Sequence, residues 1–121
     1  MPPRETTASA SDTAPTEAEV RAPVVCVACR ATLSYLDMRR EVDGAHEHTF
    51  LNPAGVVYTI RCFHGAPGAA FVGEPTSAFS WFVGWTWRIA LCAACGAHVG
   101  WRWDRDDAAF VGLIATAIAE P

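Results

Sequence analysis

The chain from residue 48 onward alternates between short apolar segments and turn-forming residues. NPAG, HGAPG, GEPTS and CGA are rich in Gly, Pro, Asn and Ser, which favour tight turns. The segments that they separate are rich in β-branched and aromatic residues, and we predict a strand in each: HTFLN, GVVYTIRCF, AAFVG, WRIALC and HVGWRW. The last segment, AAFVGLIATAIAE, fits a strand with a short helical turn, or one helix. ATLSYLDMRREV is ambiguous. The pattern therefore predicts a mainly β, antiparallel fold.

The first 22 residues have a different composition. They are almost entirely Pro, Ala, Ser, Thr and Glu, with no aromatic residue. Such a segment buries too little apolar surface to offset its ordering entropy, so we predict a disordered tail over 1–22 and one folded domain over 23–121. The tail has no apolar run behind basic residues, so we do not expect a secretory signal. The expected location is the cytoplasm.

Charge and composition argue against several classes of function. The net charge is −4 and all nine basic residues are arginine. A weakly acidic chain is not expected to bind nucleic acid generally. Without lysine, Schiff-base chemistry and Walker-type phosphate loops are excluded. No apolar run is long enough to cross a membrane, so we expect no membrane contact.

Four of the five cysteines form two CxxC pairs. They are Cys26, Cys29, Cys92 and Cys95. Two such turns facing each other supply four thiolates in a tetrahedron, which suits Zn²⁺. A pair of disulfides would need an oxidising compartment, and a redox CxxC would need a βαβ setting that neither pair has. We predict one structural zinc ion with no open position for catalysis.

The remaining cysteine and the histidines have no metal-site spacing. Cys62 follows the alternation of VVYTIRCF and is expected to be a small buried apolar residue, although Arg61 and His64 nearby leave a reactive thiol open. The histidines are expected to be hydrogen-bonded structural residues: His46, His48, His64 and His98.

All five tryptophans lie between Phe79 and Trp103, around the second CxxC pair. Residues two apart on a strand share a face, so Trp101 and Trp103 point the same way. The strands that flank the second CxxC should form a hairpin, which brings Trp87 near Trp101 or Trp103. Gly84 lets the preceding loop, with Trp81, fold back over the indoles. The rings either fill a core or wall a pocket for a small, compact ligand.

The segment FSWFVGWTWRIALCAACGAHVGWRW resembles the thalidomide-binding (CULT) domain of the cereblon family, and especially its small bacterial members. The similarity lies in the SWF loop, a Trp before CxxC, and the GW that follows. HEHTFLNPAG matches the upstream family segment, and FVGLI matches near the end. The resemblance covers residues 23–119.

The resemblance implies a β-tent, in which two antiparallel sheets are pinned by a zinc ion on four cysteines. It implies a cage with Trp81, Trp87 and Trp101 as walls and Trp103 as floor. The ligand would be a cyclic imide: a glutarimide of the thalidomide type, or a C-terminal imide on a damaged protein. The imide would bind the backbone of the SWF loop. The implied ligand-binding residues are Asn52, Pro53, Phe79, Ser80, Trp81, Trp85, Trp87, Trp101 and Trp103.

The sequence departs from the family pattern at Phe79, where vertebrate members have histidine, and at Trp85, which replaces a tyrosine of the pocket rim. We therefore expect a non-enzymatic, monomeric binding module. The alternatives are an aromatic cage for quaternary ammonium or methyl-lysine groups, and an enzyme. A reductase of the methionine sulfoxide type would need a cysteine after Cys95, and an imide hydrolase would need a positioned base.

Overall fold

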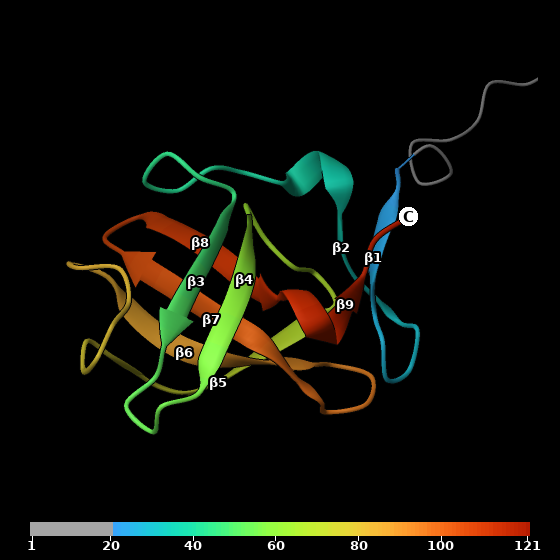
Figure 1. Ribbon diagram of the computed structural model, residues 1–121. Helices are drawn as coiled ribbons and strands as arrows, with labels where there is room; N and C mark the ends of the chain where they lie inside the picture. The colour runs from blue at the N-terminus through green and yellow to red at the C-terminus, as the bar shows by residue number, and fades with distance from the viewer. Residues whose placement is uncertain (1–20) are drawn as a thin grey trace, which may run out of the picture.

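In the computed structural model, which describes residues 21–121, the chain forms two antiparallel sheets with almost no helix (Figure 1). This confirms the predicted fold class. The strands are β1 (Pro23–Cys26), β2 (Thr32–Tyr35), β3 (Glu47–Leu51), β4 (Val57–Phe63), β5 (Ala69–Thr76), β6 (Thr86–Cys92), β7 (His98–Arg105), β8 (Ala108–Ile114) and β9 (Ile118–Ala119). Two 3₁₀ turns, η2 (Leu36–Met38) and η3 (Ala115–Ala117), complete the elements.

The larger sheet has six strands in the order β3-β4-β8-β7-β6-β5. The predicted hairpin around the second CxxC is confirmed as β6–β7, and its register places Trp87 opposite Trp103. Near the turn the register shifts, so that Gly100 pairs with Ala90 but His98 pairs with Leu91. Val99 is the extra residue of this bulge, which turns its side chain to the other face of the sheet.

The smaller sheet has the order β2-β1-β9 and joins the two ends of the domain. The structure also settles the secondary structure of the two segments whose sequence was ambiguous. ATLSYLDMRREV contains β2 and η2, and AAFVGLIATAIAE is a strand, a 3₁₀ turn and the short β9 rather than one helix. β1 was not predicted, because four residues without alternation give no strand signal of their own.

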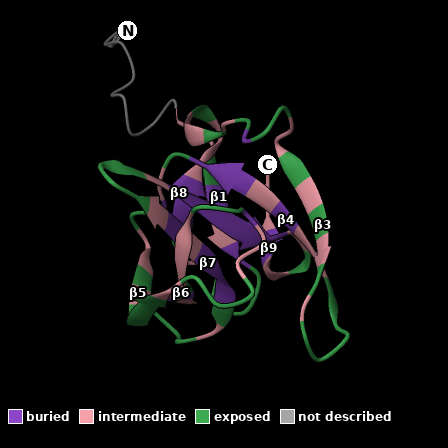
Figure 2. Cartoon of the chain, turned by 90° about the vertical axis from the view of Figure 1, so that its left-hand side faces the viewer, coloured by how far each residue is buried: buried purple, intermediate pink, exposed green. Residues whose placement is uncertain are grey.

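Two groups of buried side chains lie between and beside these strands. The metal-end core contains mainly aliphatic residues, among them Val24, Leu33 and Val99. The pocket-end core is mainly aromatic and contains Phe82, Trp101, Trp103 and Phe110. Figure 2 shows burial concentrated on β4, β7 and β8, whereas β3 and β5 at the two edges are largely exposed.

The predicted tail lies almost wholly outside the described residues. Its last two residues are described, and both contact the domain. The Arg21 guanidinium makes two bonds to the Asp37 carboxylate, of 2.9 and 3.0 Å, and the Leu36 N–H donates to the Ala22 carbonyl at 2.9 Å. Within the described residues no helix is long and apolar enough to cross a membrane.

Candidate functional site: an aromatic pocket and a four-cysteine cluster

The two CxxC turns meet at one end of the molecule. The sulfurs of Cys26 and Cys95 are 3.8 Å apart, those of Cys29 and Cys92 are 3.6 Å apart, and all four lie within 4.8 Å of one another. Disulfide-bonded sulfurs would be about 2.05 Å apart, so the disulfide alternative does not fit. Zn–S bonds of about 2.3 Å in a tetrahedron give S···S edges of about 3.8 Å. The four thiols therefore form a cluster that can hold a metal ion.

The two turns have the same backbone design. In each, the first cysteine's carbonyl accepts a hydrogen bond from the N–H four residues later, Arg30 in one turn and Gly96 in the other, both at 2.8 Å. These two residues have φ values of 70° and 80°, in the left-handed region. Burial raises the pKa of Cys92, but hydrogen bonds from the N–H groups of Cys95 and Ala94 and with the thiols of Cys29 and Cys95 together lower it to about 7. A thiol of low pKa loses its proton readily to a binding cation.

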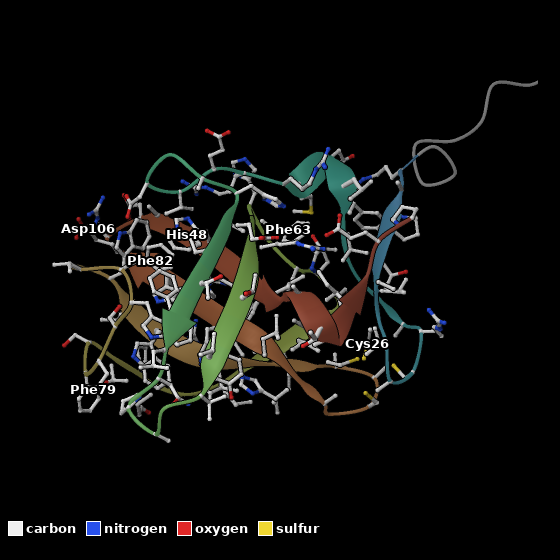
Figure 3. The ribbon with its side chains drawn as sticks, viewed as in Figure 1. Cys26, His48, Phe63, Phe79, Phe82 and Asp106 are labelled. Atoms are coloured by element: carbon white, nitrogen blue, oxygen red, sulfur yellow. The ribbon has the colours of Figure 1, made fainter. Side chains whose placement is uncertain are left out.

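A cavity of about 260 Å³ opens at the other end of the molecule. It is lined by Asn52, Pro53, Phe79, Trp81, Trp87, Trp101 and Trp103. The first two come from the β3–β4 turn, the next two from the β5–β6 loop, and the last three from β6 and β7. Figure 3 shows Phe79 and Cys26 at opposite ends of the molecule, so the cavity is separate from the cysteine cluster.

Hydrogen bonds from indole N–H groups and contacts with neighbouring rings hold the tryptophan walls in place. The Trp81 indole N–H donates to the Leu51 carbonyl at 3.1 Å, and the Trp87 indole N–H donates to the Ala78 carbonyl at 2.8 Å. Trp81 stacks on Phe50 with 5.0 Å between ring centroids and meets Trp101 edge to face at 4.8 Å. With the N–H groups of these two walls engaged, the cavity presents flat indole faces rather than side-chain donors.

The β5–β6 loop adds a polar edge to this cavity. Phe79 has φ of 56°, a left-handed conformation that is rare for a bulky residue, and the residue is 76% exposed. Within the described part of the chain, neither the Phe79 carbonyl nor the Trp81 backbone N–H has a hydrogen-bond partner. Both residues line the cavity, so a free acceptor and a free donor belong to its lining loop.

Two residues implied by the resemblance lie outside the cavity lining. The Ser80 hydroxyl donates to the Phe82 carbonyl at 2.9 Å and so shapes the loop. Trp85 meets Phe110 edge to face at 4.9 Å, and the Arg105 guanidinium lies 4.6 Å from its ring centroid. The resemblance implied Trp85 as a ligand-binding residue at the pocket rim. The structure instead begins β6 at Thr86, after a turn at Gly84 with φ of 89°, so the alternation does not extend to Trp85.

The sequence did not identify the residues that support the walls. Phe50 backs Trp81, and Phe82 meets the floor residue Trp103 edge to face at 4.9 Å. Gly112 lies beneath the Trp103 ring, where a Cβ atom would come within 2.8 Å of it. Phe50 and Phe82 lie within the motifs that resemble the cereblon family, so the resemblance could have identified them.

The fifth cysteine and three of the four histidines have structural roles. Cys62 is fully buried, and burial raises the pKa of its thiol to about 12, so the reactive alternative does not fit. His48 Nε2 lies 2.8 Å from the Val42 carbonyl oxygen, His46 Nδ1 lies 3.2 Å from that of Arg40, and His98 Nε2 lies 3.0 Å from that of Gly100. These three rings are anchored to the backbone rather than gathered around the pocket.

Comparison with known proteins gives one consistent result. Cereblon of Xenopus tropicalis is 35% identical over 74 residues, which is 57% of this chain and 17% of the frog protein. Cereblon of Drosophila persimilis is 32% identical over 80 residues, 64% of this chain and 13% of the fly protein. Cereblon of Drosophila grimshawi is 29% identical over 101 residues, 77% of this chain. The chain is similar to one part of each of these cereblon proteins.

The match is consistent with the predicted cereblon-type CULT domain. No family model matches the chain. The chain spans less than one fifth of the cereblon proteins named above, so it corresponds to one segment of much longer chains. All three are animal proteins, and the likeness to small bacterial members stays a prediction.

Proposed function

We propose that this domain is a non-enzymatic binding module for cyclic imides such as the glutarimide ring. The main supporting observation is that a cavity walled by indole faces adjoins an unpaired backbone pair, the Phe79 carbonyl and the Trp81 N–H. The ring edge of an imide alternates acceptor, donor and acceptor. Its N–H would donate to the Phe79 carbonyl, and one of its oxygens would accept from the Trp81 N–H. The polarised C–H groups of the ring suit the electron-rich faces of indoles.

The same contacts give a reason for selectivity. A lactam of the same ring size can make both hydrogen bonds, but its N–H is the weaker donor to the Phe79 carbonyl because only one carbonyl withdraws electrons from it. A typical hydrogen bond contributes about 0.5–1.5 kcal/mol, so weakening this one lowers the affinity by at most roughly tenfold. Asn52 and Pro53 line the mouth and would contact whatever is attached to the imide. The physiological ligand on this proposal is an imide-bearing small molecule or a C-terminal imide on a protein.

The metal would be Zn²⁺ and its role structural. Four thiolates at tetrahedral spacing match this ion, and all four positions would be filled by protein. A zinc ion with four protein ligands stabilises the fold and leaves no position for a reactive water. We also propose that the module acts as a monomer in a reducing compartment, the cytoplasm, with no nucleic-acid or membrane partner.

Titration of the indole fluorescence tests the proposal with three probes: glutarimide, the lactam δ-valerolactam and tetramethylammonium. We expect saturable quenching by glutarimide, weaker binding of the lactam by up to about tenfold, and no saturation with the ammonium ion. Replacing Trp87 with Ala should remove glutarimide binding. The matched control is Trp85→Phe, which changes an indole outside the cavity and should leave binding intact.

The result that would overturn the proposal is saturable quenching by the ammonium ion alone, as in a cation–π cage. Such cages often add a carboxylate, and among the described residues no acidic side chain lines this cavity. Asp104, which follows Trp103 in the chain, accepts hydrogen bonds of 3.2 Å from Arg102 instead. Loss of glutarimide during incubation with the protein would instead show an imide-opening enzyme.

A further inference from the structure

The face of the six-stranded sheet opposite the pocket carries a pair of arginines at the open end of the β6–β7 hairpin. Trp87 and Trp103 are directly opposite one another, and both line the cavity. Side chains alternate along a strand, so their neighbours Arg88 and Arg102 point to the other face of the sheet. These two arginines are also directly opposite one another. Like charges in directly opposite positions are destabilising, so a counter-charge is expected beside them.

One carboxylate serves both arginines. Arg102 donates from Nε to both oxygens of Asp104 at 3.2 Å, and its Nη2 lies 3.1 Å from Oδ2. Arg88 Nη2 lies 3.7 Å from Asp104 Oδ1, which is too far for a hydrogen bond. In the described part of the chain, no other acidic group forms an ion pair with either arginine. The cluster of these three side chains therefore has one positive charge in excess.

The terminal nitrogens of this cluster are open to solvent. In Arg88 only Nε is buried, whereas Nη1 and Nη2 reach solvent and make no hydrogen bond within residues 21–121. Arg102 Nη1 is accessible and without a hydrogen bond in the same part of the chain. The two side chains are 27% and 33% exposed. The terminal nitrogens of a guanidinium form a fork that fits a carboxylate, so an approaching acidic group has free donors to bind.

Phe71 of the edge strand β5 holds the two guanidinium groups against one aromatic ring. Its ring centroid lies 5.2 Å from Arg102 Cζ and 6.0 Å from Arg88 Cζ. Phe71 pairs with Ala90 and packs against the metal-end core. Cation–π contacts at these distances are attractive and keep the charged groups close together. The cluster thus combines fixed positive charge with adjoining apolar surface.

This combination fits a protein partner better than a free ion. Water and salt weaken the attraction between a partly exposed arginine and a small ion. An acidic side chain of a partner brings apolar neighbours with it, which can contact the ring of Phe71. One further negative charge makes the charges of the cluster equal, whereas a phosphate dianion would leave a negative excess. The charge balance therefore favours a single carboxylate.

We propose that the face around Arg88, Arg102 and Phe71 is an interaction surface for a protein partner that presents an Asp or Glu side chain with apolar neighbours. The partner's carboxylate accepts hydrogen bonds from the terminal nitrogens of Arg88 and from Nη1 of Arg102. The surface lies on the opposite face of the sheet from the pocket, so this inference does not depend on imide binding.

Two matched peptides test the surface on the full chain. The probes are the acetylated and amidated pentapeptide Gly-Phe-Glu-Phe-Gly and its counterpart with Gln in place of Glu. We expect the Glu peptide to bind at least about fivefold more tightly, the effect of one hydrogen-bonded charge pair. In Arg88→Gln the ratio of the two affinities should fall to about one. Arg105→Gln removes a positive charge that lies over Trp85, outside the cluster, and should keep the wild-type ratio.

Binding is measured from ¹H–¹⁵N spectra. The Nε–H of Arg88 is buried, which slows its exchange with water, so its resonance should be visible and should shift with the Glu peptide. Asp104→Asn covers the case in which Arg88→Gln folds poorly. It removes the competing carboxylate, so the Glu peptide should bind about fivefold more tightly than to the wild type. A poorly folded protein would not show such a gain.

Inorganic phosphate is the third probe and separates a partner's carboxylate from a small phosphate ligand. It should shift the Arg88 resonance less than the Glu peptide does at the same concentration. Saturation by phosphate at a lower concentration than by the Glu peptide would overturn the proposal. Equal binding of the two peptides by the wild type, or a preference for Glu that persists in Arg88→Gln, would also contradict it.

Discussion

The β6–β7 hairpin has a different kind of site at each end. At its turn, Cys92 and Cys95 supply half of the metal cluster, and at its open ends Trp87 and Trp103 line the pocket. A strand rises about 3.3 Å per residue, so Cys92 lies roughly 16 Å along β6 from Trp87. A metal ion at the cysteine end would be held by four short bonds between defined atoms. The pocket end depends on aromatic rings packed edge to face.

This difference explains how a small domain keeps an open pocket. Flat rings meeting at large angles leave a gap between them, and an unfilled gap is destabilising. A domain of this size has little surplus stability from its core alone. A metal ion held by the four cysteines would supply stability that does not depend on how tightly the pocket end packs. The pocket can therefore remain ready for a ligand.

Removing the metal should have the largest effect. A structural zinc ion contributes about 10 kcal/mol or more, which is comparable to the whole stability of a domain. We expect Cys92→Ser, or treatment with a strong chelator, to unfold the domain and abolish glutarimide binding, as measured by circular dichroism and fluorescence. Cys62→Ala is the control and should keep one metal ion per chain. A metal-free protein that still bound the ring would show that the two ends are independent.

A change at the pocket end should leave the metal in place. In Gly112→Ala the new methyl group would lie 2.7 Å from Ile60 Cδ1 and 2.8 Å from Trp103 Cζ3. We expect a loss of about 1–3 kcal/mol in unfolding free energy from overpacking, and weaker glutarimide binding because the floor is displaced. Metal content by elemental analysis should stay at one per chain. Gly65→Ala meets only the flexible Met38 side chain at 3.3 Å and should change neither property.

Cys62 belongs to the pocket-end core, and its ionisation makes the stability of the domain depend on pH. Its pKa rises from 9.0 to about 12 in the folded protein because the thiol is buried. The neutral thiol therefore contributes stability below pH 9 that is lost as pH rises toward 12, where the unfolded thiol ionises first. Between about pH 8 and pH 10.5 this loss is about 2 kcal/mol.

The measurement compares the wild type with Cys62→Ala in urea at both pH values. The wild type should lose about 2 kcal/mol more than the variant over this interval. An equal loss in the two proteins would mean that Cys62 ionises in the folded state as easily as in the unfolded state.

The smallest effect concerns the two metal-binding turns. Gly96 has φ of 80°, and a Cβ atom placed on it would meet nothing within 4 Å, so Gly96→Ala adds only backbone strain. We expect a loss of about 1 kcal/mol in unfolding free energy. Arg30 has φ of 70° in the equivalent position of the other turn, and Arg30→Gly should be neutral or slightly stabilising. Thermal unfolding of both variants with metal bound measures the difference, and equal shifts of the same sign would contradict it.

The sequence predicted the parts of the fold that depend on local patterns. Each CxxC pair fixes a turn, and the second turn dictates the β6–β7 hairpin that brings Trp87 opposite Trp103. The pairing of β1 with β9 was not predictable, because it joins two very short strands from opposite ends of the domain. The bulge at Val99 was also missed, since alternation alone cannot show one extra residue.

The candidate site was predictable to a similar extent. The tryptophans at 81, 87, 101 and 103 lie around one cavity, as the hairpin and the folded-back loop had indicated. Trp85 does not, because Gly84 reverses the chain just before β6 begins. The position of the Trp103 ring over Gly112 depends on the rotation of one side chain, which no sequence pattern specifies.

The cysteine cluster also has a consequence for chain connectivity. It joins Cys26 and Cys29 to Cys92 and Cys95, so a bound metal closes residues 30–91 into a loop. For a cross-link around a loop of this length, the entropy removed from the unfolded chain is equivalent to about 4 kcal/mol. A backbone cut in the β3–β4 turn would leave two fragments that the metal still holds together. Two separately produced pieces could then reassemble the pocket whenever zinc is supplied.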